Sequence, residues 1–161
     1  MIAQNGDKNT KSNNHKRKIL FVCTGNTCRS PMAEYYFNGE IKKLKKRGII
    51  ASSRGLVADT GSSMSRNAQE VLTLNHILKA NTHKAKQVDE KILNESEKIY
   101  GITVHHELIL KEKFPEFKDK IFNMPEDIGD PYGGSLEVYE RCFENIKRSV
   151  DMIIKKLAEG I

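Results

Sequence analysis

Lys18-Ile19-Leu20-Phe21-Val22 is an apolar run that predicts a buried strand, and Cys23-Thr24-Gly25-Asn26-Thr27-Cys28-Arg29-Ser30 follows it directly. Pro31 comes next, and proline is typical of the first position of a helix. These residues therefore predict a loop that joins a strand to the N-terminus of a helix. The backbone N–H groups of such a loop converge on a concave site for an anion.

Cys23 and Arg29 give this anion site its predicted chemistry. The positive end of the helix and the Arg29 guanidinium favour the thiolate form of Cys23, which is the nucleophilic form. Arg29 can hold two oxygens of a phosphoryl group in a bidentate grip that lysine cannot reproduce. The spacing alone also fits a strand-ending cysteine and a surface arginine, but the strand, the Gly-Asn loop, Ser30 and Pro31 favour a site for phosphoryl transfer.

Strands and helices alternate along the rest of the chain. Strands are predicted at residues 18–22, 49–57 (interrupted at 52–55), 98–103 and 120–124, and helices at 31–47, 63–75, 88–93, 104–113 and 136–157. The predicted apolar stripes are Ala33, Tyr36, Phe37, Ile41 and Leu44 in the first helix, and Leu136, Tyr139, Phe143, Ile146, Val150, Ile153 and Leu157 in the last. This alternation predicts a single α/β domain with three layers, α/β/α, around a four-stranded parallel sheet. The phosphate loop after the first strand then lies at the carboxyl edge of the sheet.

A second block, Asp130-Pro131-Tyr132, precedes the last predicted helix. With the Cys23–Ser30 loop, it makes residues 17–161 resemble the low-molecular-weight protein tyrosine phosphatase superfamily. The resemblance implies a flavodoxin-like fold, with Cys23 as the nucleophile, Arg29 on the phosphoryl group and Asp130 as the general acid. Taken alone, Asp130 lies in a sequence typical of an ordinary loop.

The resemblance implies hydrolysis without a metal or cofactor. Cys23 attacks phosphorus and forms a phosphocysteine while Asp130 protonates the leaving atom, and Asp130 then takes a proton from the hydrolytic water. Loop N–H groups from Thr24 to Arg29 stabilise the equatorial oxygens. Ser30 resembles the family hydroxyl that hydrogen-bonds the nucleophile.

Other residues are expected to support the loop. Asn26 occupies a position where left-handed backbone is tolerated, and Ser53 and His83 resemble the serine and histidine that buttress this asparagine in the family. On its own, His83 also fits a surface position, and His105 and His106 match no motif and are predicted on a helix surface. The predicted site residues are Cys23, Arg29 and Asp130 for catalysis; Thr24, Gly25, Asn26, Thr27, Cys28, Ser30, Ser53 and His83 for phosphate binding and loop support; and Thr27 with Tyr132 for the substrate wall.

Two departures from the tyrosine-directed pattern bear on the substrate. Thr27 stands where those members usually have a branched aliphatic residue, and here the chain resembles bacterial protein arginine phosphatases. The guanidinium of phosphoarginine needs hydrogen-bond acceptors when enclosed, and a threonine hydroxyl can accept where an isoleucine methyl cannot. Gly133 replaces a second aromatic residue and leaves Tyr132 as a single wall. Phosphoarginine on proteins is therefore the favoured substrate and phosphotyrosine the alternative, while Thr27 as a simple filler remains open.

The cysteines weigh against two further functions. Thioredoxin-coupled arsenate reductases need additional relay cysteines, and the sequence has none between Cys28 and Cys142. A non-catalytic phosphate-binding module would not explain Cys23, Arg29 and Asp130 together. Cys28 either forms a reversible disulfide that protects Cys23 from oxidation or packs behind the loop, and Cys142 is predicted to be a small buried hydrophobic residue.

Length and charge set the remaining expectations. The 161 residues suffice for one domain, with residues 1–16 predicted as a disordered basic tail and 17–161 as the phosphatase domain. Much of the net charge of +6 lies in that tail and in the cluster Lys42–Arg47 at the end of the first predicted helix, where it complements the helix dipole. No basic face with aromatic residues, membrane span or secretory segment is visible. A cytoplasmic monomer that acts on phosphorylated proteins is expected.

Overall fold

The computed structural model describes residues 16–159, and it has one sheet of four parallel strands. The strands are β1 (Arg17–Cys23), β2 (Ile49–Gly55), β3 (Lys98–Gly101) and β4 (Ile121–Asn123), in the order β2-β1-β3-β4. All three neighbouring pairs are parallel. The predicted four-stranded parallel sheet is therefore confirmed. The predicted tail lies outside the described residues except for Lys16.

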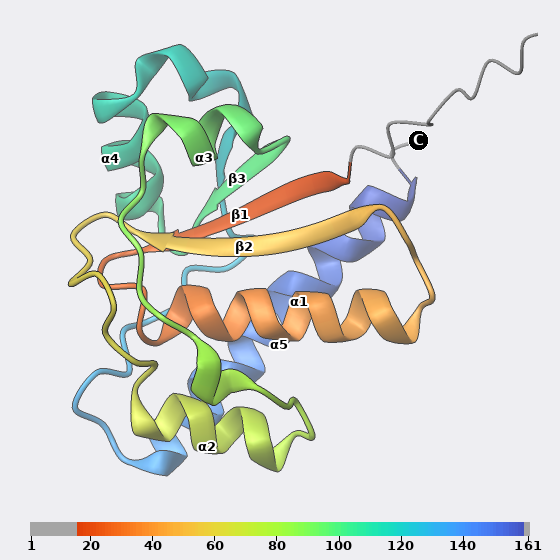
Figure 1. Cartoon of the computed structure of the whole chain (residues 1–161), viewed down its shortest axis with the longest axis vertical. Coiled ribbons are helices and arrows are strands. Elements are labelled where there is room, and N and C mark those ends of the chain that lie inside the picture. The colour runs from red at the N-terminus through yellow and green to blue at the C-terminus, as the bar shows by residue number, and fades with distance from the viewer. Residues whose placement is uncertain (1–15, 160–161) are drawn as a thin grey trace, which may run out of the picture.

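Five α-helices cover the two faces of this sheet. They are α1 (Arg29–Lys43), α2 (Arg66–Leu74), α3 (Glu90–Glu95), α4 (Val104–Lys113) and α5 (Leu136–Glu159), with short 3₁₀ turns at Ala80–Thr82 and Pro115–Lys120. In Figure 1, α1, α2 and α5 lie on one side of the sheet and α3 and α4 on the other. Among residues 16–159, no helix combines the length and apolarity needed to cross a membrane.

The central strand β1 is apolar and buried at every position from Ile19 to Cys23, whereas Arg17 and Lys18 at its start are exposed. Ile19 and Phe21 pack into the core beneath α1 and α5, whereas Leu20 and Val22 pack into the second core beneath α4. All four side chains are buried because successive residues of a strand face opposite sides of a sheet that is covered on both. This burial fixes the end of β1, and with it the position of Cys23.

Three details of the sequence-based prediction were wrong. Strand β2 runs without interruption to Gly55, because all seven of its residues pair with β1. Helix α1 ends at Lys43, and the chain turns away through Lys45 and Gly48, which both have positive φ. Leu44 is therefore 52% exposed and does not belong to the apolar stripe. Helix α2 begins at Arg66, because Ser63 pairs with Lys84 in an isolated bridge.

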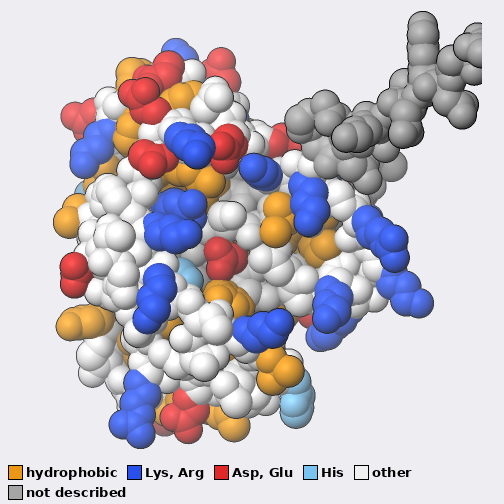
Figure 2. All heavy atoms as spheres, viewed as in Figure 1, with side chains coloured by type: hydrophobic (Ala, Val, Ile, Leu, Met, Phe, Trp, Pro, Cys, Tyr) orange, Lys and Arg blue, Asp and Glu red, His pale blue; other side chains and the backbone are white. Residues whose placement is uncertain are grey.

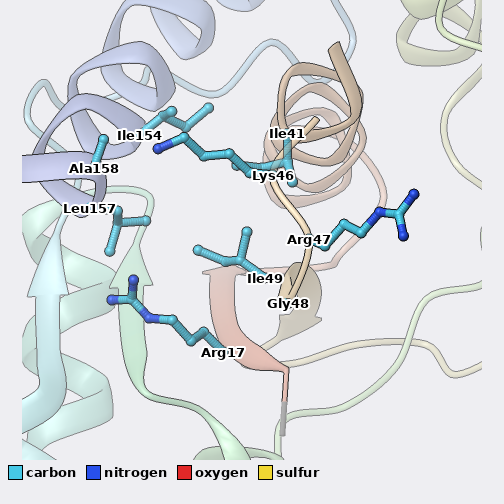
Figure 3. Close-up of a pocket in the computed structure, with 9 residues that line it drawn as sticks. All are labelled: Arg17, Ile41, Lys46, Arg47, Gly48, Ile49, Ile154, Leu157 and Ala158. Atoms are coloured by element: carbon cyan, nitrogen blue, oxygen red, sulfur yellow. The ribbon is translucent and has the colours of Figure 1, made fainter. Parts of the chain in front are cut away.

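A cavity of about 200 Å³ lies at the amino edge of the sheet, where β1 begins and α1 and α5 end. Figure 3 shows Ile49, Ile154 and Leu157 around it, with the Lys46 side chain reaching across toward Ile154. In Figure 2, lysine and arginine side chains gather over the right-hand end of the molecule, where α1 ends in Figure 1. This region is called the amino-edge cavity below.

Candidate active site

The segment between β1 and α1 forms a loop at the carboxyl edge of the sheet. Cys23 is the last residue of β1 and is buried, and its Sγ lies 2.9 Å from Oγ of Ser30 in the first turn of α1. Among the described residues, no protein acceptor takes a hydrogen bond from the backbone N–H groups of residues 25–28. Unpaired N–H groups at a helix N-terminus favour an anion.

Asn26 holds this loop in shape from the inside. Its φ of 58° is left-handed, and its side chain is completely buried. The amide Nδ2 donates to Oγ of Ser30 and to Oγ of Ser53, both at 2.9 Å, and Oδ1 accepts from the N–H of Lys86 at 3.0 Å. These three hydrogen bonds tie the amide to α1, β2 and the segment before α3, and they offset the cost of the left-handed backbone.

His83 supports the same residue through its backbone. This side chain is 7% exposed, and its Nε2 donates to the carbonyl oxygen of Asn26 at 2.8 Å. Burial lowers the pKa of His83. The structure thus brings both Ser53 and His83 to Asn26, and the surface position that the sequence left open for His83 is wrong.

Glu34 continues this network away from the loop. The Ser53 hydroxyl donates to its carboxylate oxygen Oε1 at 3.4 Å. Burial raises the pKa of Glu34 from 4.5 to about 7. The Glu34 carboxyl, with its raised pKa, is therefore connected to Asn26 through the hydroxyl of Ser53.

Arg29 and Asp130 meet on the other side of the loop. The Arg29 side chain is buried, and its Nη1 donates to the carbonyl oxygen of Ile128 at 2.9 Å. Its Nη2 lies 3.8 Å from Oδ2 of Asp130, which stands on the loop between β4 and α5. Asp130 also accepts a hydrogen bond from the N–H of Tyr132 at 3.0 Å. One side of the guanidinium is anchored, and the other side is directed toward the exposed carboxylate.

These groups surround one cavity of about 230 Å³. Its lining consists of Cys23, Thr24, Gly25, Thr27, Cys28, Arg29, Asp130 and Tyr132. Tyr132 is 80% exposed and forms the rim. A thiol, a guanidinium, a carboxylate and unpaired N–H groups thus share a space that can hold a phosphoryl group. Within residues 16–159, no cluster of His, Cys, Asp or Glu is arranged to hold a metal ion.

Cys28 and Cys142 are buried thiols near this cavity. Cys28 Sγ lies 3.2 Å from Oγ of Ser65 and 3.4 Å from the Tyr139 hydroxyl. Cys142 faces the carbonyl oxygen of Gly129 at 3.7 Å, and burial raises its pKa to about 12. Cys142 therefore occupies the buried position that the sequence predicted.

His106 is the residue that sequence reasoning missed. It is 3% exposed and its Nε2 lies 3.0 Å from Oγ1 of Thr24, so the predicted surface position is wrong, whereas His105 is exposed as expected. The reason is that α4 begins beside the loop, so its first turn faces Thr24. A signal was available, because Thr103 stands three residues before His106 and the two form a capping box at the start of α4.

Comparisons with known proteins agree with this site. A family model described as low molecular weight phosphotyrosine protein phosphatase matches residues 18–160. The chain is 37% identical over 147 residues to a protein-arginine-phosphatase of Geobacillus stearothermophilus, covering 87% of this chain and 95% of that one. It is 39% identical over 135 residues to a low molecular weight protein-tyrosine-phosphatase of Staphylococcus haemolyticus, covering 80% and 91%.

A solved structure extends the agreement to three dimensions. The low molecular weight protein tyrosine phosphatase from T. tengcongensis aligns with a TM-score of 0.83 and 38% identity, over 88% of this chain and 99% of that one. The similarity therefore runs from the first strand to the last helix. With relatives more than 30% identical over most of their length, the chain belongs to the low molecular weight phosphotyrosine protein phosphatase family.

Proposed function

We propose that this chain is a protein phosphatase that hydrolyses phosphoarginine on proteins through a phosphocysteine intermediate. The observation that carries the proposal is the cavity wall, where Thr27 lines the space that also holds Cys23, Arg29 and Asp130. A hydroxyl at this place offers an acceptor to an enclosed guanidinium. Tyr132 is the one aromatic residue of that lining.

The hydrogen bonds around Ser30 allow its hydroxyl to donate to the Cys23 sulfur. Because Nδ2 of Asn26 donates to Oγ of Ser30, the Ser30 proton is free to point at the Cys23 sulfur, 2.9 Å away, with the Arg54 carbonyl oxygen as a second acceptor at 3.4 Å. The same bond stabilises the sulfur as a leaving group in the second step.

The reaction then has two steps. The Cys23 sulfur forms a bond to phosphorus while the bond from phosphorus to the guanidinium nitrogen breaks, and Asp130 gives its proton to that nitrogen. Asp130, now a carboxylate, takes a proton from a water that attacks the phosphocysteine and releases phosphate. Arg29 and the loop N–H groups bind the phosphoryl oxygens in both steps.

Thr27→Ile tests the substrate class. The substitution removes an acceptor beside the leaving group, which we expect to lower kcat/KM for a phosphoarginine peptide by roughly ten- to a hundredfold. The phenol ring of a matched phosphotyrosine peptide needs no hydrogen-bond acceptor here, so kcat/KM for that peptide is expected to hold or rise. Equal loss on both peptides would mean that Thr27 only shapes the loop.

Phosphotyrosine is the alternative substrate, and the exposed ring of Tyr132 at the rim is the observation that favours it. An aromatic wall suits a phenol ring. The Staphylococcus haemolyticus relative, named a tyrosine phosphatase, is as similar as the arginine phosphatase, so overall identity does not separate the two activities. A wild-type preference for the phosphotyrosine peptide would overturn the phosphoarginine proposal.

The role of Cys28 remains a proposal with two forms, because its contacts with Ser65 and Tyr139 fit packing as well as a thiol held ready for Cys23. Mass spectrometry after mild peroxide treatment separates them. A linked Cys23–Cys28 peptide, with activity restored by thiol reductant, supports the protective disulfide. Sulfinic or sulfonic Cys23 without that link rejects it. The cytoplasmic location and monomeric state stay predictions.

A further inference from the structure

The hydrogen bonds of His106 define which of its ring nitrogens carries the proton. Its Nδ1 lies 3.2 Å from the backbone N of Thr103, and a backbone N–H can only donate. Nδ1 is therefore an acceptor without a proton. A neutral ring with an unprotonated Nδ1 carries its proton on Nε2. Burial also lowers the pKa of His106 to about 4, which keeps the ring neutral near neutral pH.

The Nε2–H group then fixes the hydroxyl of Thr24. These atoms are 3.0 Å apart, and because Nε2 donates, Oγ1 of Thr24 accepts. A hydroxyl has one proton and two lone pairs, so Thr24 keeps one lone pair and its own proton. Within the part of the chain that the structure describes, His106 is the one hydrogen-bond partner of this hydroxyl.

The remaining capacity of Thr24 is available to the cavity, because Thr24 lines it together with Asp130 and Tyr132. These are the residues around the leaving group in the proposed reaction. The guanidinium of phosphoarginine presents N–H donors, which a hydroxyl lone pair accepts, whereas the carbon edge of a phenol ring presents none. A hydroxyl held in one orientation loses less entropy on binding than a freely rotating one.

We propose that His106 is a positioning residue that orients the Thr24 hydroxyl as a second acceptor, beside Thr27, for the guanidinium of the substrate. The inference rests on the proposed function, since it concerns the recognition of phosphoarginine. His106 acts only through Thr24 and does not touch the substrate itself. The capping box at α4 gives His106 a structural role as well, and the experiment has to separate the two.

The test compares His106→Leu with His106→Gln. Leucine removes both the acceptor for the Thr103 N–H and the donor to Thr24, whereas the glutamine amide can accept from Thr103 or donate to Thr24 from near the position of Nε2, and thermal unfolding reports separately on the cap. The measured quantity is the ratio of kcat/KM for a phosphoarginine peptide to kcat/KM for the matched phosphotyrosine peptide. We expect the ratio to fall about tenfold in His106→Leu, the scale of one lost hydrogen bond, and to stay within about threefold of wild type in His106→Gln.

Thr24→Val supplies the second half of the test, and it does not depend on the fold of the His106 variants. It is expected to lower the ratio as much as His106→Leu, with no further loss in the double variant, because both changes remove the same contact. His105→Leu is the matched control, since His105 is the exposed neighbour on α4 and its substitution is expected to leave the ratio unchanged. Thermal unfolding of each variant reports on the cap.

Three outcomes overturn the inference. Equal loss in His106→Leu and His106→Gln overturns the role of the Nε2–H donor, because the glutamine amide can still donate to Thr24. A fall in kcat/KM by the same factor for both peptides in Thr24→Val assigns Thr24 to loop support. Additive losses in the double variant mean that His106 and Thr24 act independently of each other. A wild type that prefers phosphotyrosine overturns the proposed function as well, whereas the first three outcomes in a wild type that prefers phosphoarginine leave that function standing.

Discussion

The carboxyl and amino edges of the sheet carry cavities of similar size and opposite character. The candidate active site has a volume of about 230 Å³ and the amino-edge cavity about 200 Å³. Around the first lie the buried polar side chains of Asn26, Ser30, Ser53, His83 and His106, each with a hydrogen-bond partner. The second is lined by aliphatic side chains and solvent-exposed cations. Because burying polar groups is costly, a network of them marks a functional site better than cavity volume does.

Helix direction explains the difference in charge. The N-termini of α1 and α4, with their partial positive charge, lie at the carboxyl edge, where an anion is favoured. The C-termini of α1 and α5 lie at the amino edge, and Lys42 and Lys43 occupy the last turn of α1. Positive side chains there complement the helix ends. The basic cluster therefore has a structural explanation and needs no phosphate ligand.

Replacing the nucleophile should have the largest effect of all the variants. It tests whether the reaction takes place at the carboxyl edge of the sheet. Cys23→Ser is expected to abolish turnover, because the hydroxyl is a far weaker nucleophile than a thiolate. Inorganic phosphate should still bind, as the loop N–H groups and Arg29 remain. Activity assays with and without EDTA, together with phosphate titration, check both points. Residual turnover close to wild type, or a strict need for added divalent metal, would contradict the phosphocysteine mechanism.

Asp130→Asn should have the next largest effect. The amide keeps the acceptor for the Tyr132 N–H but cannot give a proton to the leaving group. We expect kcat to fall by about a hundredfold on substrates with poor leaving groups, the usual scale of a positioned acid. The loss should shrink on an aryl phosphate with a good leaving group, which needs no protonation. An equal loss on both substrates would assign Asp130 to the ion pair with Arg29 instead.

The sequence predicted the loop at the carboxyl edge well, because Cys23, Arg29 and Ser30 lie in one short run that ends a strand and starts a helix. His83 was predicted only through the family resemblance and His106 was missed, since each acquires its partner from a distant segment: Asn26 for the first and Thr24 for the second. A lone histidine carries no periodicity that reveals such a partner. The end of α1 was misjudged for a related reason, because Leu44 continues the apolar spacing one residue past the last turn.

Glu34→Gln tests whether the ionised form of the buried Glu34 carboxyl lowers the free energy of unfolding. The pKa of Glu34 is raised to about 7 by burial, so the folded state holds a proton that the unfolded state releases above about pH 4.5. Protonated Glu34 therefore contributes fully to the free energy of unfolding below pH 4.5, and this contribution is lost as the pH rises to about 7. Glutamine keeps an acceptor for Ser53 without titrating. We expect Glu34→Gln to gain about 3 kcal/mol relative to wild type between pH 4.5 and 8.

Denaturant unfolding of both proteins across this pH range measures the effect. The difference in unfolding free energy should grow through the interval from 4.5 to 7 and then level off. Glu97→Gln is a control at the amino edge, where the ion pair with Arg17 lowers the pKa of Glu97. Its effect has the opposite sign, because loss of an ionised, paired carboxylate weakens the protein most above its ordinary pKa. A flat difference for Glu34→Gln would show that Glu34 is solvated.

The smallest effect is expected at the amino edge itself. Lys46→Ala combined with Arg47→Ala removes two cations that line the amino-edge cavity. Charges on that rim are screened over about 8 Å at physiological ionic strength, and they lie at the opposite end of the strands from Cys23. We therefore expect kcat/KM for the phosphoarginine peptide to stay within about twofold of wild type. Arg29→Lys is the matched contrast, because it keeps the charge but loses the bidentate grip and should lower kcat/KM by at least about tenfold. A large loss in the Lys46 and Arg47 variant would mean that both edges of the sheet bind the substrate, and the contrast between them would fail.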